Sequence, residues 1–244
     1  MVAETDRQAA LISTPYAGWN VRHVRSAVWT VTVIIVLLGV AREAFVHVIG
    51  TGTALKDLRH ISLDGELNIA TWYSSSLMLA ASALSLLASR LDSDGRQRRY
   101  WLMISAVMLL MSIDETASFH ESLITVFDSW AQYSDYLHFA WVVVAIPFVI
   151  LFGIVSVPFL SRLPRKTAAR FVAAGVLFVF GALVMEMIDG AIQVRLGAES
   201  LAYRLGAMTE DAFELIGMSL FVTVLVSYVL RFTHVVEDGP LRRH

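Results

Sequence analysis

Acidic side chains and histidines recur inside segments that are otherwise apolar, and these are the residues in the chain best suited to chemistry. The three richest groups are Asp114-Glu115 with His120-Glu121, Glu186 with Asp189, and Glu210-Asp211 with Glu214. Carboxylate oxygens and imidazole nitrogens are the usual protein ligands of divalent metal ions. Placing them in apolar surroundings carries a free-energy cost, which something in the fold must offset.

Helical spacing determines which of these side chains can meet. Residues at i, i+3, i+4 and i+7 share one face of a helix. Four acidic stripes follow: Asp114 with Ser118 and Glu121; Glu186 with Asp189, Gly190 and Gln193; Glu210 with Glu214; and Glu43 with His47. We expect all four stripes to face one cavity, with Glu115 and His120 flanking the first and Asp211 lying off the third.

This pattern predicts a carboxylate cluster that binds a divalent metal ion, whether calcium, manganese, iron or zinc. The predicted ligands are Asp114, His120, Glu121, Glu186, Asp189, Glu210 and Glu214. A metal-bound water could attack an ester, amide or phosphoester, with Glu115 as the general base. The depth of the site suits a lipid-like substrate that enters from the bilayer. The chain has neither a His-Glu-x-x-His nor a Glu-x-x-His motif that would identify the reaction.

The elements that must position these residues are membrane-spanning helices. Hydrophobic residues make up 57% of the 244 positions and charged residues only 16%, far from the composition of a soluble domain. Runs of about 20 apolar residues can cross a bilayer as helices. Six such runs predict an all-α, six-helix transmembrane bundle: Ala27 to Ile49, Leu67 to Ser89, Tyr100 to Phe127, Leu137 to Ser161, Phe171 to Val194 and Thr209 to Phe232.

The distribution of Lys and Arg predicts how the bundle is oriented. These residues gather in the N-terminal arm, in the second and fourth loops and in the C-terminal tail. Because cytoplasmic segments retain positive charge, we expect both termini in the cytoplasm and the acids in the extracytoplasmic half. The expected organisation is an N-terminal arm over 1–26, a transmembrane domain over 27–232 and a tail over 233–244. The preference for Arg over Lys is typical of GC-rich bacteria, so we expect a bacterial inner-membrane protein.

The overall charge and the absence of cysteine exclude several classes of function. The formal net charge of −2 leaves no basic face for a nucleic acid, so nucleic acid is not an expected partner. Without cysteine the chain has no disulfide, thiolate nucleophile or cysteine-ligated metal.

Two other functions remain open, and the sequence does not decide whether the chain is an enzyme. The first is a proton- or cation-coupled transporter, in which Ser82, Ser85 and Ser105 would line a route through the apolar half. The second is an accessory subunit that binds other membrane proteins, whose acids pair with Arg42, Arg195 and Arg204. Aromatic residues near the helix ends, Trp141 among them, are interpreted as interfacial anchors.

Overall fold

A computed structural model of the chain describes residues 21–49, 54–65, 67–120, 122 and 134–237. The predicted all-α fold is confirmed, because the described residues form helices and contain no strand. Within this part of the chain, six helical spans are long and apolar enough to cross a membrane. The protein is therefore a multi-pass integral membrane protein built as a six-helix bundle.

Five of the six spans are single α-helices, and one is composite. The single helices are α2 (Val21–Ile49), α3 (Ile69–Leu91), α4 (Gly95–Ala117), α6 (Val142–Leu160) and α9 (Leu201–Glu237). The composite span joins α7 (Arg165–Val179), the π-helical segment η4 (Phe180–Met185) and α8 (Glu186–Leu196). Two short 3-10 helices, η2 (Ala54–Ile61) and η3 (Asp135–Leu137), lie in connections between spans.

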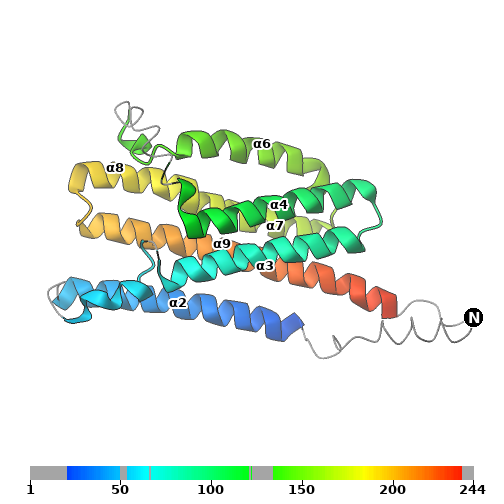
Figure 1. The fold of residues 1–244 in the computed structure, drawn as a ribbon, viewed down its shortest axis with the longest axis horizontal. Helices are drawn as coiled ribbons and strands as arrows, with labels where there is room; N and C mark the ends of the chain where they lie inside the picture. The colour runs from blue at the N-terminus through cyan, green and yellow to red at the C-terminus, as the bar shows by residue number, and fades with distance from the viewer. Residues whose placement is uncertain (1–20, 50–53, 66, 121, 123–133, 238–244) are drawn as a thin grey trace, which may run out of the picture.

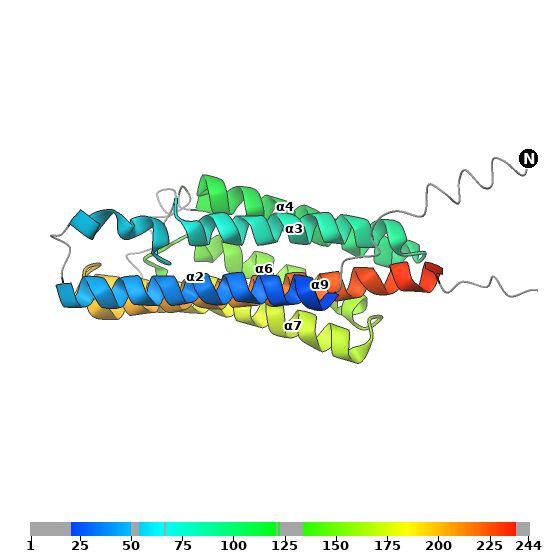
Figure 2. The same ribbon diagram turned by 90° about the horizontal axis from the view of Figure 1, so that it is seen from below.

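Helix α9 is the central element of the bundle. It packs against α2, α3, α7, η4 and α8, while α6 lies along the opposite side of α4 and α7 from α2 (Figure 1). The beginning of α2 and the end of α9 lie at the same end of the bundle in both views (Figures 1 and 2). This arrangement agrees with the prediction that both termini share one side of the membrane. Which side that is stays a prediction.

Helices α3 and α4 form a hairpin joined by paired serines. Ser82 Oγ donates to the Ser105 carbonyl at 2.8 Å, and Ser105 Oγ donates back to the Ser82 carbonyl at 2.9 Å. One heptad towards the other end, Ser75 and Ser112 repeat the reciprocal pair at 2.9 Å. Small residues that bond across the interface let two helices approach closely in lipid. Ser82 and Ser105, proposed above to line a transport route, therefore bond to each other instead.

Local capping sets where these two helices begin. Asn68 accepts a hydrogen bond from the Thr71 amide at 2.8 Å, and Asp94 accepts one from the Arg96 amide at 2.8 Å. Both are the short polar side chains that favour a helix N-terminus. The Arg96 amide, followed by the charge of Arg162, holds the pKa of the Asp94 carboxyl below its ordinary value. Asn68 and Asp94 thus mark where α3 and α4 begin, and both are residue types that the sequence shows as helix caps.

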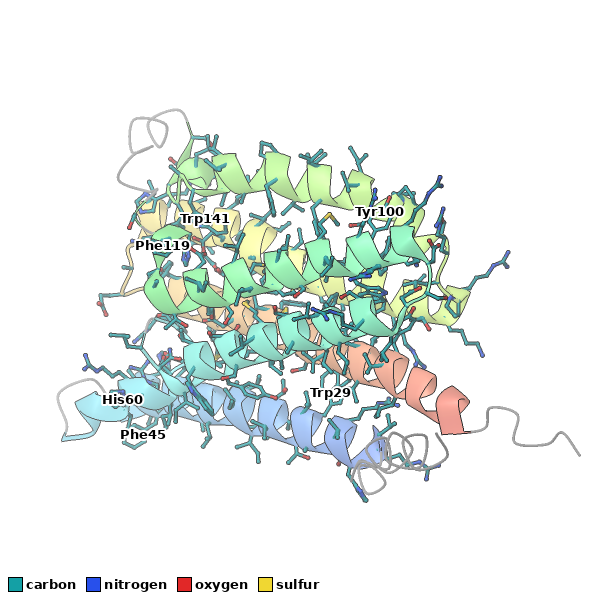
Figure 3. All side chains as sticks on the ribbon, turned by 45° about the vertical axis from the view of Figure 1, so that its right-hand side comes forward. Trp29, Phe45, His60, Tyr100, Phe119 and Trp141 are labelled. Carbon is teal, nitrogen blue, oxygen red and sulfur yellow. The ribbon has the colours of Figure 1, made fainter. Side chains whose placement is uncertain are left out.

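An aromatic cluster lies at the end of the bundle that contains the start of α4 and the end of α6. Trp101 is fully buried there, and its ring meets Phe159 edge-on at 4.7 Å and Tyr228 at 4.9 Å between centroids. Tyr100, on the same turn, lies at the opposite end of the bundle from Trp141 (Figure 3). These ring contacts join α4 to α6 and α9.

Two predicted spans differ from the observed helices in ways that matter for the site. Helix α4 does not continue to Phe127: it ends at Ala117, and Ser118 adopts the left-handed conformation with φ of 51°. Asp114 therefore lies in the last turn of α4 rather than deep in a span. The fifth span is longer than the predicted Phe171 to Val194, since it runs from Arg165 to Leu196. Its π-helical segment falls immediately before Glu186.

Candidate functional site

An acidic cavity of about 420 Å³ lies between α4, α6, the composite span and α9, at the end of the bundle opposite the aromatic cluster. Eight carboxyl groups line it: Asp64, Asp114, Glu115, Glu186, Asp189, Glu210, Asp211 and Glu214. His120, Trp141 and Tyr203 complete its polar lining, and the lining residues that the structure describes include no Lys or Arg. Eight carboxyl groups cannot all be charged in one enclosed space without compensating protons or cations.

Asp189 is the most deeply buried acid of the cavity. Asp189 is only 1% exposed, and neither of its carboxylate oxygens receives a hydrogen bond from the described residues. Its carboxylate packs on Gly206 of α9, where an added Cβ would overlap Asp189 Oδ1. Glu210, one turn further along α9 from Gly206, lines the same cavity. A buried carboxylate without a donor needs a proton or a cation.

The π-helical segment brings Glu186 and Asp189 onto the cavity wall. Its Gly181 lies against α9, where a Cβ would come within 2.8 Å of the Glu210 carbonyl oxygen and 2.9 Å of Glu214 Cγ. A π-helical turn inserts an extra residue and rotates everything after it, and such turns recur at functional sites. The close approach at Gly181 and the rotation together place Glu186 opposite the acids of α9.

Asp114 and His120 form a pair across the turn that ends α4. Asp114 Oδ2 lies 2.9 Å from His120 Nδ1, and Asp114 Oδ1 accepts from the His120 backbone amide at 3.0 Å. Both carboxylate oxygens are therefore engaged by one residue. The prediction that Asp114 and Ser118 share a helical stripe is wrong, because α4 ends between them, and Glu121, the third member of the predicted stripe, lies outside the described residues. A carboxylate bonded to Nδ1 orients an imidazole, as in many catalytic and metal-binding histidines.

Trp141 connects the histidine to the acids on the facing wall. Its indole Nε1 donates to Glu186 Oε1 at 2.8 Å, and its ring lies 5.3 Å from the His120 ring between centroids. Trp141 and Phe119, which precedes His120, lie near each other at one end of the bundle (Figure 3). Trp141 was interpreted from the sequence as an interfacial anchor, but the structure places it in the cavity. Nothing in its sequence context distinguishes it from the other tryptophans near helix ends.

The sequence also missed Asp64, because it lies in a connection rather than in a helix. Asp64 follows η2 and lines the cavity from the side of α3. Burial, followed by the nearby charge of Glu43, raises the pKa of the Asp64 carboxyl above its ordinary value. A helical periodicity cannot place a loop residue, so no spacing argument could have included it.

The structure brings most of the predicted site residues to this one cavity. Six of the seven predicted metal ligands line it, namely Asp114, His120, Glu186, Asp189, Glu210 and Glu214, and the seventh, Glu121, lies outside the described residues. Glu115, the predicted base, and Asp211 line it as well. Among the side chains that the structure describes, however, no three His, Asp or Glu lie close enough together to hold a metal ion as they stand.

Two predictions about charge do not hold. Glu43, expected to face the same cavity, is not among its lining residues and pairs with Arg42 instead. Arg195, expected to neutralise the acids, contacts Asp135 at 2.9 Å outside the cavity. Arg204 Nε is buried with no hydrogen-bond partner among the described residues. The ion pairs of Arg42 and Arg195 are therefore with acids outside the cavity lining.

Comparison with known sequences places the chain in a family. The family described as "Domain of unknown function (DUF8692)" matches residues 22–229. The chain belongs to this family. The match extends from the start of α2 almost to the end of the described part of α9, so it includes every residue lining the acidic cavity. No curated protein and no solved structure gives a significant match. Membership of the DUF8692 family therefore adds no activity, and the function must be argued from the cavity.

Proposed function

We propose that the acidic cavity binds a divalent metal ion and that the protein is a metal-dependent hydrolase acting on a lipid-like substrate. The observation that carries the proposal is Asp189, whose two oxygens are buried without a donor in a cavity lined by seven further acids. A buried carboxylate without a partner is destabilising unless it is protonated or coordinates a cation. Carboxylate oxygens favour calcium, manganese or iron, and His120 would extend the set to zinc.

The proposed ligands are the acids that face one another across the composite span and α9. Asp189 and Glu210 line the cavity from the two facing elements, and Glu214 follows Glu210 by one turn on the same face. In a metal-free protein these groups repel one another, so an ion must draw them together to form its coordination sphere. Their protons leave as the ion binds, and the apparent affinity therefore falls as the pH is lowered.

The opposite wall supplies the groups that hydrolysis needs besides the ion. A bound divalent ion polarises an ester or phosphoester and activates water. Glu115 takes the proton of the attacking water, and the proton then passes to the leaving alcohol as the ester bond breaks. His120, oriented by Asp114, lies on the same wall and can donate a hydrogen bond to the leaving oxygen until the proton held by Glu115 reaches it. Asp114 is thus proposed as a positioning residue rather than as a direct ligand.

Two features disfavour the alternative functions. A transporter needs a polar route through the other half of the bundle, yet Ser82 and Ser105 are bonded to each other. An accessory subunit would neutralise its cavity acids with arginine, yet Arg42 and Arg195 contact Glu43 and Asp135, which do not line the cavity. A bacterial inner-membrane location, with the cavity on the extracytoplasmic side, remains part of the proposal.

Metal binding is tested first, on the full chain in lipid nanodiscs. After dialysis against manganese or calcium, elemental analysis should find bound metal in the wild type and at least about tenfold weaker binding in Glu214→Gln. Glu199→Gln is the matched control, since Glu199 is exposed in the α8–α9 connection. No metal above background in the wild type, or equal losses in both variants, would overturn the proposal.

Hydrolysis is tested separately from binding. Incubation with a membrane lipid extract should give metal-dependent product release by mass spectrometry in the wild type. Glu115→Gln should keep the bound metal but lose about 100-fold or more of the rate, the contribution expected of a general base. Unchanged turnover in Glu115→Gln would remove it from the mechanism, and transport of the metal without product release would favour the transporter.

A further inference from the structure

A second cavity, of about 530 Å³, lies directly beyond the acidic one and has almost entirely apolar walls. It is formed by α4, α6, α7 and α9 and extends along α6 from Phe148 to Phe159. At 1.5 Å per residue this stretch is about 17 Å long, close to the half of a roughly 30 Å hydrocarbon core that one leaflet contributes. Its volume lies in the range of roughly 300–1,000 Å³ of ordinary ligand sites.

The two cavities adjoin. Five residues line both of them: Met111, Phe148, Val149, Phe178 and Val179. A molecule with its polar end among the acids and its other end in the apolar cavity would pass between these side chains. Only an elongated molecule, polar at one end and apolar along its length, matches this shape.

Two glycines on the wall of the apolar cavity have open space beside them. A Cβ added at Gly153 of α6 or at Gly175 of α7 would meet no atom within 4 Å, and both exposed glycines line the cavity. Gly217 of α9 lines it too but is tightly packed, because a Cβ there would come within 2.7 Å of the Phe178 amide nitrogen. The cavity wall is therefore close-packed at Gly217 and leaves room for larger side chains at Gly153 and Gly175.

The cavity is also accessible from the bilayer. Phe148, Val172 and Val176 line it, yet they are 53%, 47% and 61% exposed on the membrane-facing surface. Ser156, which lines it too, is 8% exposed, and its hydroxyl has no partner among the described residues. The wall between α6 and α7 thus faces lipid and has room for a lipid chain to enter sideways.

We infer that the apolar cavity holds one hydrocarbon chain of a membrane lipid whose head group lies in the acidic cavity, so that the substrate class is a chain-bearing lipid. The assignment of this lipid as substrate rests on the proposed hydrolase function, whereas occupancy of the cavity by the chain does not. The chain lies along α6, and Phe148 and Phe178 mark the passage between the cavities. Filling the apolar cavity should exclude the lipid and leave the metal site intact.

The test uses nanodiscs containing a phospholipid whose acyl chain carries a photoreactive and clickable group. In the wild type, cross-links should map to peptides of α6 and α7 that line the cavity. Gly175→Leu and Gly153→Leu fill the cavity and should each reduce this cross-linking by about tenfold, the effect expected of overpacking a site. Val157→Leu is the matched control, because Val157 is on α6 and 61% exposed but does not line the cavity.

The outcomes separate this inference from the metal proposal. Cavity cross-links that Gly175→Leu or Gly153→Leu abolishes support the inference even if the protein binds no metal. Bound metal with no cross-links to the cavity peptides, or cross-linking that both filling variants leave unchanged in folded protein, overturns it. The thermal midpoint of each variant establishes that it is folded, and either filling variant alone is sufficient for the comparison.

Discussion

Among single residues, Asp189 has the surroundings that most need explanation. Its carboxylate lies in a cavity without Lys or Arg among the described lining residues, and it packs on the backbone of α9 at Gly206. A group of this kind is unfavourable for folding, and such groups persist where function requires them. The two predictions that follow separate its cost to stability from its contribution to binding.

Asp189→Asn should stabilise the metal-free protein and abolish its stabilisation by metal. The amide removes a buried charge and can donate to Glu210, which we expect to be worth about 1–3 kcal/mol. Thermal unfolding in detergent, with and without manganese, measures both effects, and Glu199→Gln serves as the control. A lower midpoint for the metal-free Asn variant would contradict this account of Asp189.

Gly206→Ala should destabilise the protein by about 1–3 kcal/mol, because the added Cβ overlaps the Asp189 carboxylate. Gly175→Ala is the matched control: its Cβ enters open space, and alanine in a helix should be neutral or stabilising by up to about 1 kcal/mol. Truncating Asp189 to alanine in the Gly206→Ala background should recover part of the loss. Equal midpoints for Gly206→Ala and Gly175→Ala would show that the contact between the added Cβ and the Asp189 carboxylate does not lower the stability of the protein.

Among the elements, the α3–α4 hairpin illustrates what helical periodicity can and cannot predict. Leu67 to Ser89 and Tyr100 to Phe127 were predicted as spans; α3 begins at Ile69, two residues later, and α4 ends at Ala117, ten residues earlier. Ser82 and Ser105, which one hypothesis placed along a transport route, lie in the contact between α3 and α4, and a sequence does not show what a serine bonds to. Hydrogen bonding between two helices depends on their register, which one sequence does not specify.

Removing one serine pair should weaken the hairpin modestly. Ser82→Ala and Ser105→Ala should each cost about 0.6–1.7 kcal/mol, the range measured for hydrogen bonds between helices in membranes. The double variant should cost close to the sum of the two, because each change removes one hydroxyl-to-carbonyl bond and leaves the reciprocal one in place; only the Oγ–Oγ contact at 3.2 Å is lost in either single variant. Unfolding titrations in mixed micelles measure the cycle, and a double variant that costs no more than either single variant would contradict two separate bonds.

The sequence predicted the site only in part, and the turn at the end of α4 is one feature that it did not predict. Every described acid predicted as a ligand does line the cavity, because an ionisable side chain in an apolar span faces the interior of the bundle rather than lipid. The sequence did not predict the turn at Ser118, the π-helical segment before Glu186 or the involvement of Trp141 and Asp64. Each of these depends on a break in helical periodicity or on a contact between distant segments.

For the molecule as a whole, the acids lie towards one end of the bundle, and the start of α2 and the end of α9 lie towards the other. The positive-inside rule then predicts which end faces the cytoplasm. Because the chain contains no cysteine, single cysteines can report on topology without background. Ser93→Cys, in the α3–α4 turn, should react with an impermeant maleimide only after permeabilisation, and Ala198→Cys, before α9, should react in intact cells. The reverse pattern would place the acidic cavity on the cytoplasmic side.

The central claim is that the acids of one cavity jointly hold a divalent cation. The most direct measurement is anomalous diffraction from crystals of the full chain grown with manganese. The account predicts one strong anomalous peak in the cavity, within coordination distance of Asp189, Glu210 and Glu214, and its loss in Glu214→Gln. A well-ordered cavity with no anomalous peak, or with each of these carboxylates contacting an arginine, would contradict it.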